Sequence, residues 1–326
     1  MNQPPVTSRT VPWPRMQSFV ESVARAAGLQ AERAALLARL LTENDLRGVW
    51  SHGTRQIATY ARLMRDGTLN PSPATRVVSE TAVSLTVDGD GGLGYFPAYE
   101  GTLRAVEKAK SAGIAVLMTR NHGHFGAAGI YARLTLGHDL LTFVTSGHQL
   151  SLSPGDSIFS AAGGSPFAWS AQTGKEDPLV LDFGTMHDLY RGQPYREELE
   201  KNVPGMVLRH IGMGMICQAW GGLLAGLPLD PSRAQRAWSG ANQGSLLITF
   251  RISLVSDPET FKAEMDEYAR SVRKLTPIHG TDRSIFPGAI ESAREREWRE
   301  SGIPLGDDHR ETLEKIGREM SVRPPW

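Results

Sequence analysis

The chain has 326 residues, and its 35 Lys+Arg balance its 35 Asp+Glu, so the formal net charge is zero and the sequence pI is near 7.2. A nonspecific binder of nucleic acid or acidic membranes needs a basic excess or stripe, and neither is present, so small neutral or anionic metabolites are the expected partners. Cys217 is the only cysteine, which excludes an intrachain disulfide and a cysteine-based zinc site and favours a structural thiol in a packed helix. The N-terminus lacks the order of a signal peptide, and no run reaches the ~18 apolar residues of a membrane span, so we expect a cytoplasmic protein with no membrane segment.

Helical periodicity dominates the first seventy residues. Leu37, Leu40 and Leu41 fall on one side of a predicted helix, together with Leu36. A second helix is predicted to carry Arg55, Tyr60 and Met64 and to end at Gly67, a typical C-terminal cap. The N-terminal part is therefore predicted to be all helical.

From Val83 the pattern changes to strands. Residues 83–87 and 114–118 are predicted strands on either side of a helix at 97–111. Further strands are predicted at 141–144, 179–181 and 246–250. Their continuous apolar runs favour a sheet that is covered on both faces.

The C-terminal part returns to helices. Ser256-Asp257-Pro258-Glu259 is typical of a helix start, and an apolar stripe follows it that we interpret as buried core. The stripe consists of Phe261, Met265, Tyr268, Val272 and Leu275. Residues 307–320 are predicted to form a polar surface helix, and the end at Trp326 is expected to fray unless a partner covers it. We therefore predict a helical layer from residues 1–70 and 256–326, and an α/β sheet domain at 71–255 that carries the cofactor and substrate cleft.

The segment Ser51-His52-Gly53-Thr54-Arg55 is the first motif with chemistry. His52 and Arg55 are three residues apart, so on a helix they share a face and could offer one ligand a proton and a guanidinium. This pattern predicts an acid/base site for small carboxylates. The alternative is a buried histidine and an exposed arginine with no shared task.

Gly89 to Gly94 satisfies the G-x-G-x-x-G dinucleotide pattern between a predicted strand and a predicted helix. The next strand should then end in an acidic residue for the ribose, but it ends at Thr119-Arg120-Asn121. Arg120 would suit a 2′-phosphate, so the Rossmann interpretation stays open. It is the less favoured interpretation.

The second motif with chemistry runs from Asn121 to Gly129 and contains His122 and His124. With His148 and His187 it raises a metal hypothesis, in which Asp182 and Asp188 would be the carboxylate ligands. No carboxylate-rich metal signature accompanies these histidines, and loop histidines are more often simply hydrogen-bonded. We therefore predict no metal.

Several segments together resemble the malate/L-lactate dehydrogenase family of the sulfolactate dehydrogenase type, which includes ureidoglycolate dehydrogenase, diketogulonate reductase and the piperideine- and pyrroline-carboxylate reductases. The segments are 45–55, 87–89, 121–129, 164–168, 178–182, 242–244, 286–288 and 301–305. The resemblance implies an α/β, non-Rossmann fold with a mixed sheet and helical N-terminal and C-terminal layers. It also implies a homodimer that binds NAD or NADP and reversibly reduces 2-oxo acids or cyclic 2-imino acids.

The resemblance assigns roles to individual residues. His52 corresponds to the proton donor with Ser51 beside it, Arg55 to the carboxylate-binding arginine, and His124 to the family's second histidine, with Asn121 on the substrate side. Reducing a carbonyl needs a proton for the developing alkoxide and a cation for the neighbouring carboxylate, which agrees with these roles. The implied cofactor-binding residues are Ser165, Pro166, Asp182, Thr185, Arg209, His210 and Gly212.

The departures from the family pattern concentrate on the cofactor side. Ile211 and Gln193 stand where the family has lysines, Ala289 where it has glutamate, and Ser165 where it has asparagine; Trp50 replaces a polar residue. The connection before residues 208–212 is shorter than usual. Losing a cation and hydrogen-bonding groups costs on the order of 1–3 kcal/mol each, so we predict weak or lost dinucleotide binding unless Arg209 or His210 substitutes.

Three functions remain open at this point. The leading hypothesis is a divergent NAD(P)-dependent oxidoreductase that acts on a small 2-oxo, 2-hydroxy or 2-imino acid. The second is a redox-silent lyase, tautomerase or hydrolase that uses His52 and His124 for proton transfer next to a carboxylate held by Arg55. The third is a protein that binds without catalysis, as a sensor or an assembly partner.

Overall fold

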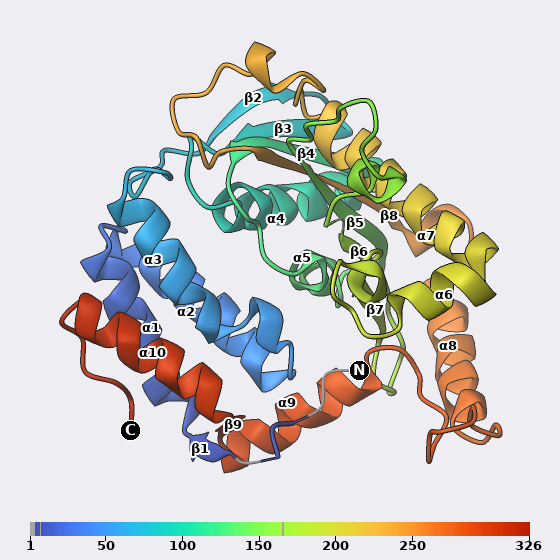
Figure 1. Cartoon of the computed structure of the whole chain (residues 1–326). Helices are drawn as coiled ribbons and strands as arrows, with labels where there is room; N and C mark the ends of the chain where they lie inside the picture. Colours follow the sequence, from blue (N-terminus) through green and yellow to red (C-terminus); the bar gives the residue numbers. More distant parts are fainter. Residues whose placement is uncertain (1–3, 7, 165) are drawn as a thin grey trace. The chain divides into compact units, whose positions relative to one another are not determined.

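The computed structural model describes residues 4–6, 8–164 and 166–326. The chain divides into two compact units, here called unit 1 (Met1–Pro73 and Val272–Trp326) and unit 2 (Ala74–Ser271). Figure 1 shows the elements of each. Within the described ranges, no helix is both long enough and apolar enough to cross a membrane.

Unit 1 is helical, as the sequence predicts for the N-terminal part. Its elements are α1 (Trp13–Ala26), α2 (Ala31–Leu46), α3 (Ile57–Arg65), α9 (Ala289–Ser301) and α10 (Asp307–Glu319), with the short strands β1 (Arg9–Val11) and β9 (Ile303–Leu305). The strands pair antiparallel, with Val11 opposite Ile303. Leu37, Leu40 and Leu41 are fully buried, and they form the core face of α2.

The segment between α2 and α3 is not the predicted helix. Residues 50–52 and 54–56 form two separate 3-10 turns, and α3 begins only at Ile57. Arg55 therefore lies in a 3-10 turn that leads directly into α3, and the prediction that His52 and Arg55 share one helix face is wrong. The physical reason is Gly53, whose extended backbone (φ −90°, ψ −157°) separates the turn of His52 from that of Arg55.

The C-terminal helix and the chain end also differ from the prediction. One face of α10 is buried through His309, Leu313 and Ile316, so the helix is amphipathic rather than polar all round. Trp326 donates a hydrogen bond from its indole to Glu314 (3.0 Å), and the Arg310 guanidinium lies over its ring. The chain end is thus held by its own α10.

Unit 2 is built on a mixed sheet with the strand order β2-β3-β4-β8-β5-β6-β7. The strands are β2 (Arg76–Glu80), β3 (Ser84–Asp88), β4 (Ile114–His122), β5 (Leu140–His148), β6 (Pro166–Ala171), β7 (Leu179–Gly184) and β8 (Gln243–Arg251). The helices are α4 (Tyr95–Ala112), α5 (Ala128–Leu134), α6 (Arg196–Asn202), α7 (Pro204–Cys217) and α8 (Pro258–Val272), of which the last residue falls in unit 1. All five predicted strands and the helix at 97–111 are confirmed.

Among the described strands, β3 and β4 form a parallel pair around α4, and the other pairs are antiparallel. A Rossmann fold requires a largely parallel sheet, so the predicted non-Rossmann α/β class is confirmed. The strands β2 and β6 escaped prediction. The first is an exposed edge strand, and the second begins with a proline, which weakens its strand signal.

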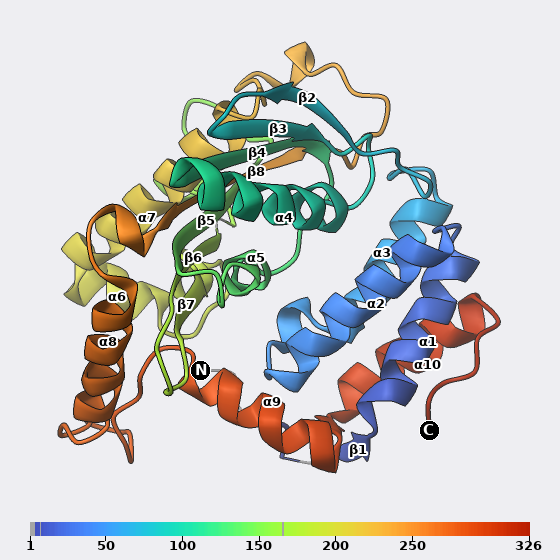
Figure 2. The same ribbon diagram turned by 180° about the vertical axis from the view of Figure 1, so that it is seen from behind.

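Helices cover both faces of the sheet, as its apolar strands predict. The close approach of Leu117 to Gly101 places α4 on one face, and α5 packs there too; Figure 2 shows both helices in front of the sheet. Met118 points to the other face and packs near Ala225. Ala225 follows the π-helix at Gln218–Leu223, which continues α7. Cys217 is buried at the end of α7, as predicted for a structural thiol.

The apolar stripe of α8 is not core. Tyr268 and Leu275 are exposed (56% and 62%), and the described buried residues of the helix are Asp266 and Ala269. Asp266 accepts hydrogen bonds from the backbone N–H groups of Gly174, Lys175 and Glu176, each at 3.0 Å. This acidic anchor, rather than the apolar stripe, ties α8 to the loop between β6 and β7.

Candidate functional site

The turn from Trp50 to Gln56 presents Ser51, His52 and Arg55 together in unit 1. A Cβ at Gly53 would lie 1.7 Å from Oδ1 of Asp45, so any other residue at this position would displace the buried Asp45 carboxylate. Asp45 lies at the end of α2, directly behind the turn. The two 3-10 turns therefore result from a buried carboxylate that packs against a backbone without a side chain.

His52 is oriented at two points of this turn. Its Nδ1 lies 2.8 Å from Oγ of Ser51, and its carbonyl accepts a hydrogen bond from Nδ2 of Asn44 (2.8 Å). Burial lowers the pKa of His52 from its ordinary value of 6.5. The imidazole is therefore neutral at pH 7, which is the form that accepts a proton from an alcohol.

Arg55 is an exposed side chain on the same turn. Its Nη1 lies 2.8 Å from Oδ2 of Asp308, at the start of α10, and the two side chains are 48% and 72% exposed. An exposed ion pair of this kind is weak, worth about 0–1 kcal/mol, so a ligand carboxylate can displace Asp308. The binding of a substrate carboxylate by Arg55 remains a prediction.

A buried polar network lies beneath the turn. Asp45, which is fully buried, accepts hydrogen bonds from both the backbone N–H (3.2 Å) and the hydroxyl of Thr54, and Nε2 of His309 lies 3.0 Å from the same hydroxyl. Burial raises the pKa of Asp45 to about 7 and lowers the pKa of His309 to about 4. His309 is consequently neutral at physiological pH.

In unit 2, Asn121 lies near the end of β4, and His124 lies in the loop that follows this strand. Asn121 has a left-handed backbone (φ 53°), and its side-chain amide donates to Oδ1 of Asp88 (2.9 Å). Its backbone carbonyl accepts from Gly91, and that of His124 from Gly94, both at 3.0 Å. The loop of residues 89–94 is therefore hydrogen-bonded along the histidine loop.

The glycines at 89–94 serve this close packing. A Cβ at Gly94 would lie 2.5 Å from Nδ1 of His122, and one at Gly91 would lie 2.1 Å from the Trp238 ring. The backbone of the G-x-G-x-x-G segment thus approaches protein side chains. Together with the mixed sheet, this geometry argues against the Rossmann interpretation.

Hydrogen bonds occupy several of the histidines that raised the metal hypothesis. Nδ1 of His122 donates to the carbonyl of Gly123 and its Nε2 accepts from Thr119, both at 2.7 Å, so neither nitrogen can ligate a metal. His148 accepts from Gln218 (3.2 Å), and exposed His187 lies beside Asp188. Across the described ranges, no group of three or more His, Cys, Asp or Glu is arranged to hold a metal ion.

The residues expected at the cofactor lie on β6, on β7 or directly after it (Thr185), and on α7, except Ser165, which lies outside the described residues. Asp182 accepts a hydrogen bond from the backbone N–H of Gly129 (3.0 Å), so β7 is connected to the end of the Asn121–Gly129 motif. Pro166 starts β6 and is half-buried. Thr185 is 1% exposed, and its hydroxyl has no hydrogen-bond partner among the described residues.

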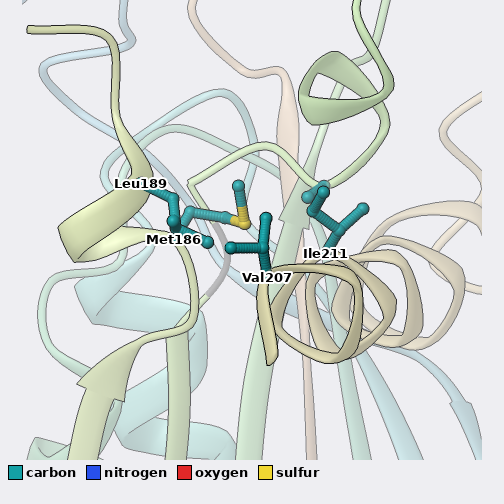
Figure 3. Close-up of a cluster of buried hydrophobic side chains, with 5 residues drawn as sticks. Met186, Leu189, Val207 and Ile211 are labelled. Carbon is teal, nitrogen blue, oxygen red and sulfur yellow. The ribbon is translucent and has the colours of Figure 1, made fainter. Parts of the chain in front are cut away.

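On α7 the expected cofactor residues Arg209, His210 and Gly212 lie on either side of Ile211. Arg209 is exposed, Gly212 is half-buried, and Nδ1 of His210 lies 3.1 Å from the carbonyl of Met206. Ile211, at the position of the family's lysine, is 2% exposed and packs in an apolar cluster (Figure 3). The members of this cluster are Ala162, Met186, Leu189, Val207 and Ile211.

The family model for malate/L-lactate dehydrogenase matches residues 11–187 and 208–314. The chain belongs to this family. The gap in the match, at 188–207, lies directly before the Leu208–Gly212 segment, where the sequence already departs from the family pattern. The relatives include named dehydrogenases, so the chain is a member of an oxidoreductase family.

Individual relatives are distant but match over most of their length. The L-sulfolactate dehydrogenase of Methanocaldococcus jannaschii is 24% identical over 94% of this chain and 96% of its own. The NAD⁺-dependent ureidoglycolate dehydrogenase of Escherichia coli K12 is 23% identical over 90% and 91%. The structure of malate dehydrogenase from Pyrococcus horikoshii superposes with a TM-score of 0.84 at 23% identity and covers 99% of both chains, which shows a common fold.

Sequence reasoning about this family member missed the residues that support the predicted ones. Thr54 and Asp45 lay within the motif but received no role, and Asp308 and His309 are about 250 residues away along the chain. A buried Asp directly before a helix end, facing a glycine, has no local sequence signature. In the sequence, Asp88, whose carboxylate binds Asn121, could likewise be recognised only as the last residue of a strand.

Proposed function

We propose that this protein is an NAD(P)-dependent oxidoreductase that interconverts a small 2-hydroxy acid and its 2-oxo acid, or reduces a cyclic 2-imino acid. The observation that carries the proposal is the 50–56 turn, where a neutral His52 and an exposed Arg55 stand together. A proton acceptor beside a carboxylate clamp is the pair of groups that oxidation of a 2-hydroxy acid requires.

Each residue of the turn has one task in this reaction. His52 accepts the hydroxyl proton during oxidation and returns it to the developing alkoxide during reduction. Ser51, hydrogen-bonded at Nδ1, fixes the orientation of the ring. Arg55 releases Asp308 and binds the substrate carboxylate through two parallel N–H donors. Asn121 and His124 are assigned to the substrate side and to a second proton-transfer role on the strength of the family resemblance.

The chain's donors fit a dinucleotide with few charged contacts. The buried, unpartnered hydroxyl of Thr185 is a hydrogen-bonding group that a bound ligand would satisfy, and Arg209 and His210 would provide the positive side chains. When bound, the nicotinamide supplies hydride donation and acceptance. Because Ile211 cannot contribute a charge, we expect weaker binding than in relatives with a lysine.

Titration of the purified protein with NADH and with NADPH, followed by nicotinamide fluorescence, tests the cofactor. Turnover is then measured with sulfolactate, malate and ureidoglycolate, the compounds for which the relatives are named. Binding at micromolar to millimolar concentration with turnover of at least one compound is the expected result. Failure of both dinucleotides to bind at millimolar concentration would overturn the oxidoreductase assignment.

The apolar packing of Ile211 gives a second candidate function specific support, namely cofactor-independent proton transfer on a small carboxylate. Conversion of such a compound without dinucleotide, and its loss in His52→Ala, would select this redox-silent function. The same assay run with and without NAD(P)H therefore separates the two.

We also propose that the protein is a homodimer. On the α7 face of the sheet, Trp169, Leu181 and Trp220 are 46%, 42% and 45% exposed and connect through Phe143, whose ring centroid lies 4.6 Å from that of Trp169 and 5.9 Å from that of Trp220. An apolar patch of this kind is typical of an interface. Sedimentation at micromolar concentration should give a dimer for the wild type and a monomer for Trp220→Glu; a wild-type monomer would contradict the proposal.

A further inference from the structure

We propose that Thr54, with Asp45 and His309, is a positioning device that sets the His52 imidazole and the Arg55 guanidinium for the reaction. This inference rests on the proposed function of the 50–56 turn. It assigns no direct contact with the substrate to the three residues. They act through the backbone between His52 and Arg55.

The three side chains form a directional chain of hydrogen bonds. With Asp45 ionised, the Thr54 hydroxyl donates to Oδ2 of Asp45, and Nε2–H of His309 donates to the Thr54 oxygen. The Thr54 backbone N–H donates to the same carboxylate oxygen at 3.2 Å. Thr54 is thereby held by both its main chain and its side chain, and its hydroxyl is the only group that links Asp45 to His309 by hydrogen bonds among the described residues.

Burial of Asp45 costs folding free energy, which argues that its contact with Thr54 is not incidental. Its side chain is 0% exposed, and its Oδ1 has no hydrogen-bond partner in the described part of the chain. A buried carboxyl with one unsatisfied oxygen destabilises a fold unless its other bonds compensate. At this position the compensating bonds are those from Thr54, and they fix the conformation of Gly53 and Thr54.

Two helices hold the turn, each through two consecutive residues. At the end of α2, Asn44 binds the His52 carbonyl and Asp45 binds Thr54. At the start of α10, Asp308 binds Arg55 and His309 binds Thr54. Both helices therefore hold Thr54 and one further group of the turn, which is the His52 carbonyl for α2 and the Arg55 guanidinium for α10. A shift at Thr54 would move both His52 and Arg55.

The matched pair Thr54→Val and Thr54→Ser tests the inference, because Val keeps the shape of Thr and removes the hydroxyl, while Ser keeps the hydroxyl. We expect kcat/KM to fall about 10–100-fold in Thr54→Val, since a displacement of ~1 Å in such a site can cost about 10²-fold. Thr54→Ser should stay within about threefold of the wild type. Both kcat and KM should change in Thr54→Val, because both reactive groups depend on the turn.

A second readout does not depend on activity. The pKa of His52, measured by NMR titration of its ring signals, should rise toward 6.5 in Thr54→Val, because a loosened turn exposes the imidazole to water. It should stay at the wild-type value in Thr54→Ser. If Thr54→Val does not fold, His309→Gln, which retains a donor near Thr54, and His309→Leu, which does not, provide the same comparison.

The outcomes separate a positioning role from a structural one. A lower melting temperature in Thr54→Val, with wild-type His52 pKa and wild-type kcat/KM, would overturn the inference. Failure of the proposed function has a different signature, namely no dinucleotide binding or full activity of His52→Ala. The titration of His52 decides the positioning role in that case as well.

Discussion

The two regions where the sequence predicts function differ in the kind of side chain that supports them. The 50–56 turn in unit 1 is supported by buried polar side chains, Asp45, Thr54 and His309, at a cost in desolvation. The α7 position in unit 2 where a lysine was expected is instead filled by Ile211, within an apolar cluster. The turn that we propose for the substrate is thus supported by buried polar groups, while the α7 segment proposed for the cofactor is packed with apolar side chains.

The largest expected effect belongs to the turn. His52→Ala should lower kcat by about 10²–10⁴-fold, because it removes the group that exchanges the substrate proton. The matched control is His279→Ala, an exposed histidine in the same unit, which should leave kcat unchanged. Steady-state kinetics at saturating substrate measures both. Near-wild-type turnover of His52→Ala would mean that the 50–56 turn has no catalytic role that distinguishes it from the α7 region.

Acid stability should also differ between the units. In unit 2, burial lowers the pKa of His122 to about 4, so its neutral form is favoured by folding, and this stability is fully present above pH 6.5 and is lost as the pH falls from 6.5 to 4. In unit 1, His309 behaves in the same way, and the lowered pKa values of His52 in unit 1 and His148 in unit 2 add a contribution of the same sign to each unit. Asp45 opposes it, because a raised pKa of about 7 means that the folded state gains stability as the pH falls from 7 to 3.8.

Hydrogen exchange followed by mass spectrometry between pH 7 and 4.5 should therefore show unit 2 losing protection before unit 1. Each fully buried histidine carries an effect on the order of 3 kcal/mol in this range. Asp45→Asn is the control, because it removes the opposing titration and should make unit 1 as acid-sensitive as unit 2. Earlier opening of unit 1 in the wild type would contradict this assignment of pKa shifts.

Truncating the apolar cluster tests the cofactor side. Ile211→Ala should lower the free energy of unfolding by about 2–4 kcal/mol, since it removes buried methyl groups and leaves a cavity. Met206→Ala on the exposed side of α7 (51% exposed) should change it by less than about 0.5 kcal/mol. Urea unfolding measures both, and equal effects would mean that the cluster is not the core of this region.

Arg55→Lys should raise KM about tenfold with little change in kcat, because a point charge cannot reproduce a bidentate clamp. Arg62 provides a matched control, since it makes a bidentate pair with Glu319 (2.7 and 2.9 Å) elsewhere in unit 1. Arg62→Lys should leave KM unchanged. An effect of Arg55→Lys confined to kcat would indicate a role other than substrate binding.

Local sequence patterns predicted most of the fold but only part of the candidate site. Helical spacing and apolar runs suffice for α2, β4 and α4, because their signals lie within a few turns or residues of each other. The shared helix face predicted for His52 and Arg55 failed because the buried Asp45 carboxylate packs against the extended backbone at Gly53, which lies between them. The apolar stripe of α8 was wrongly predicted to be core. Its helical periodicity is real, but within the chain the helix is anchored by Asp266.

The smallest expected effect concerns Asp308, the carboxylate that occupies Arg55. Asp307 and Asp308 are both in the first turn of α10, so replacing either with Asn removes the same favourable charge from the helix N-terminus. They differ in partner, because Asp307 pairs with Arg310 (3.0 Å) and Asp308 with Arg55 (2.8 Å). Since an exposed pair is worth about 0–1 kcal/mol, Asp308→Asn should lower KM for a carboxylate substrate up to about fivefold, with no change in Asp307→Asn. A raised KM in Asp308→Asn would mean that Asp308 aligns the guanidinium for the substrate instead of competing with it, and the buried network at Thr54 would then share its positioning task with a surface ion pair.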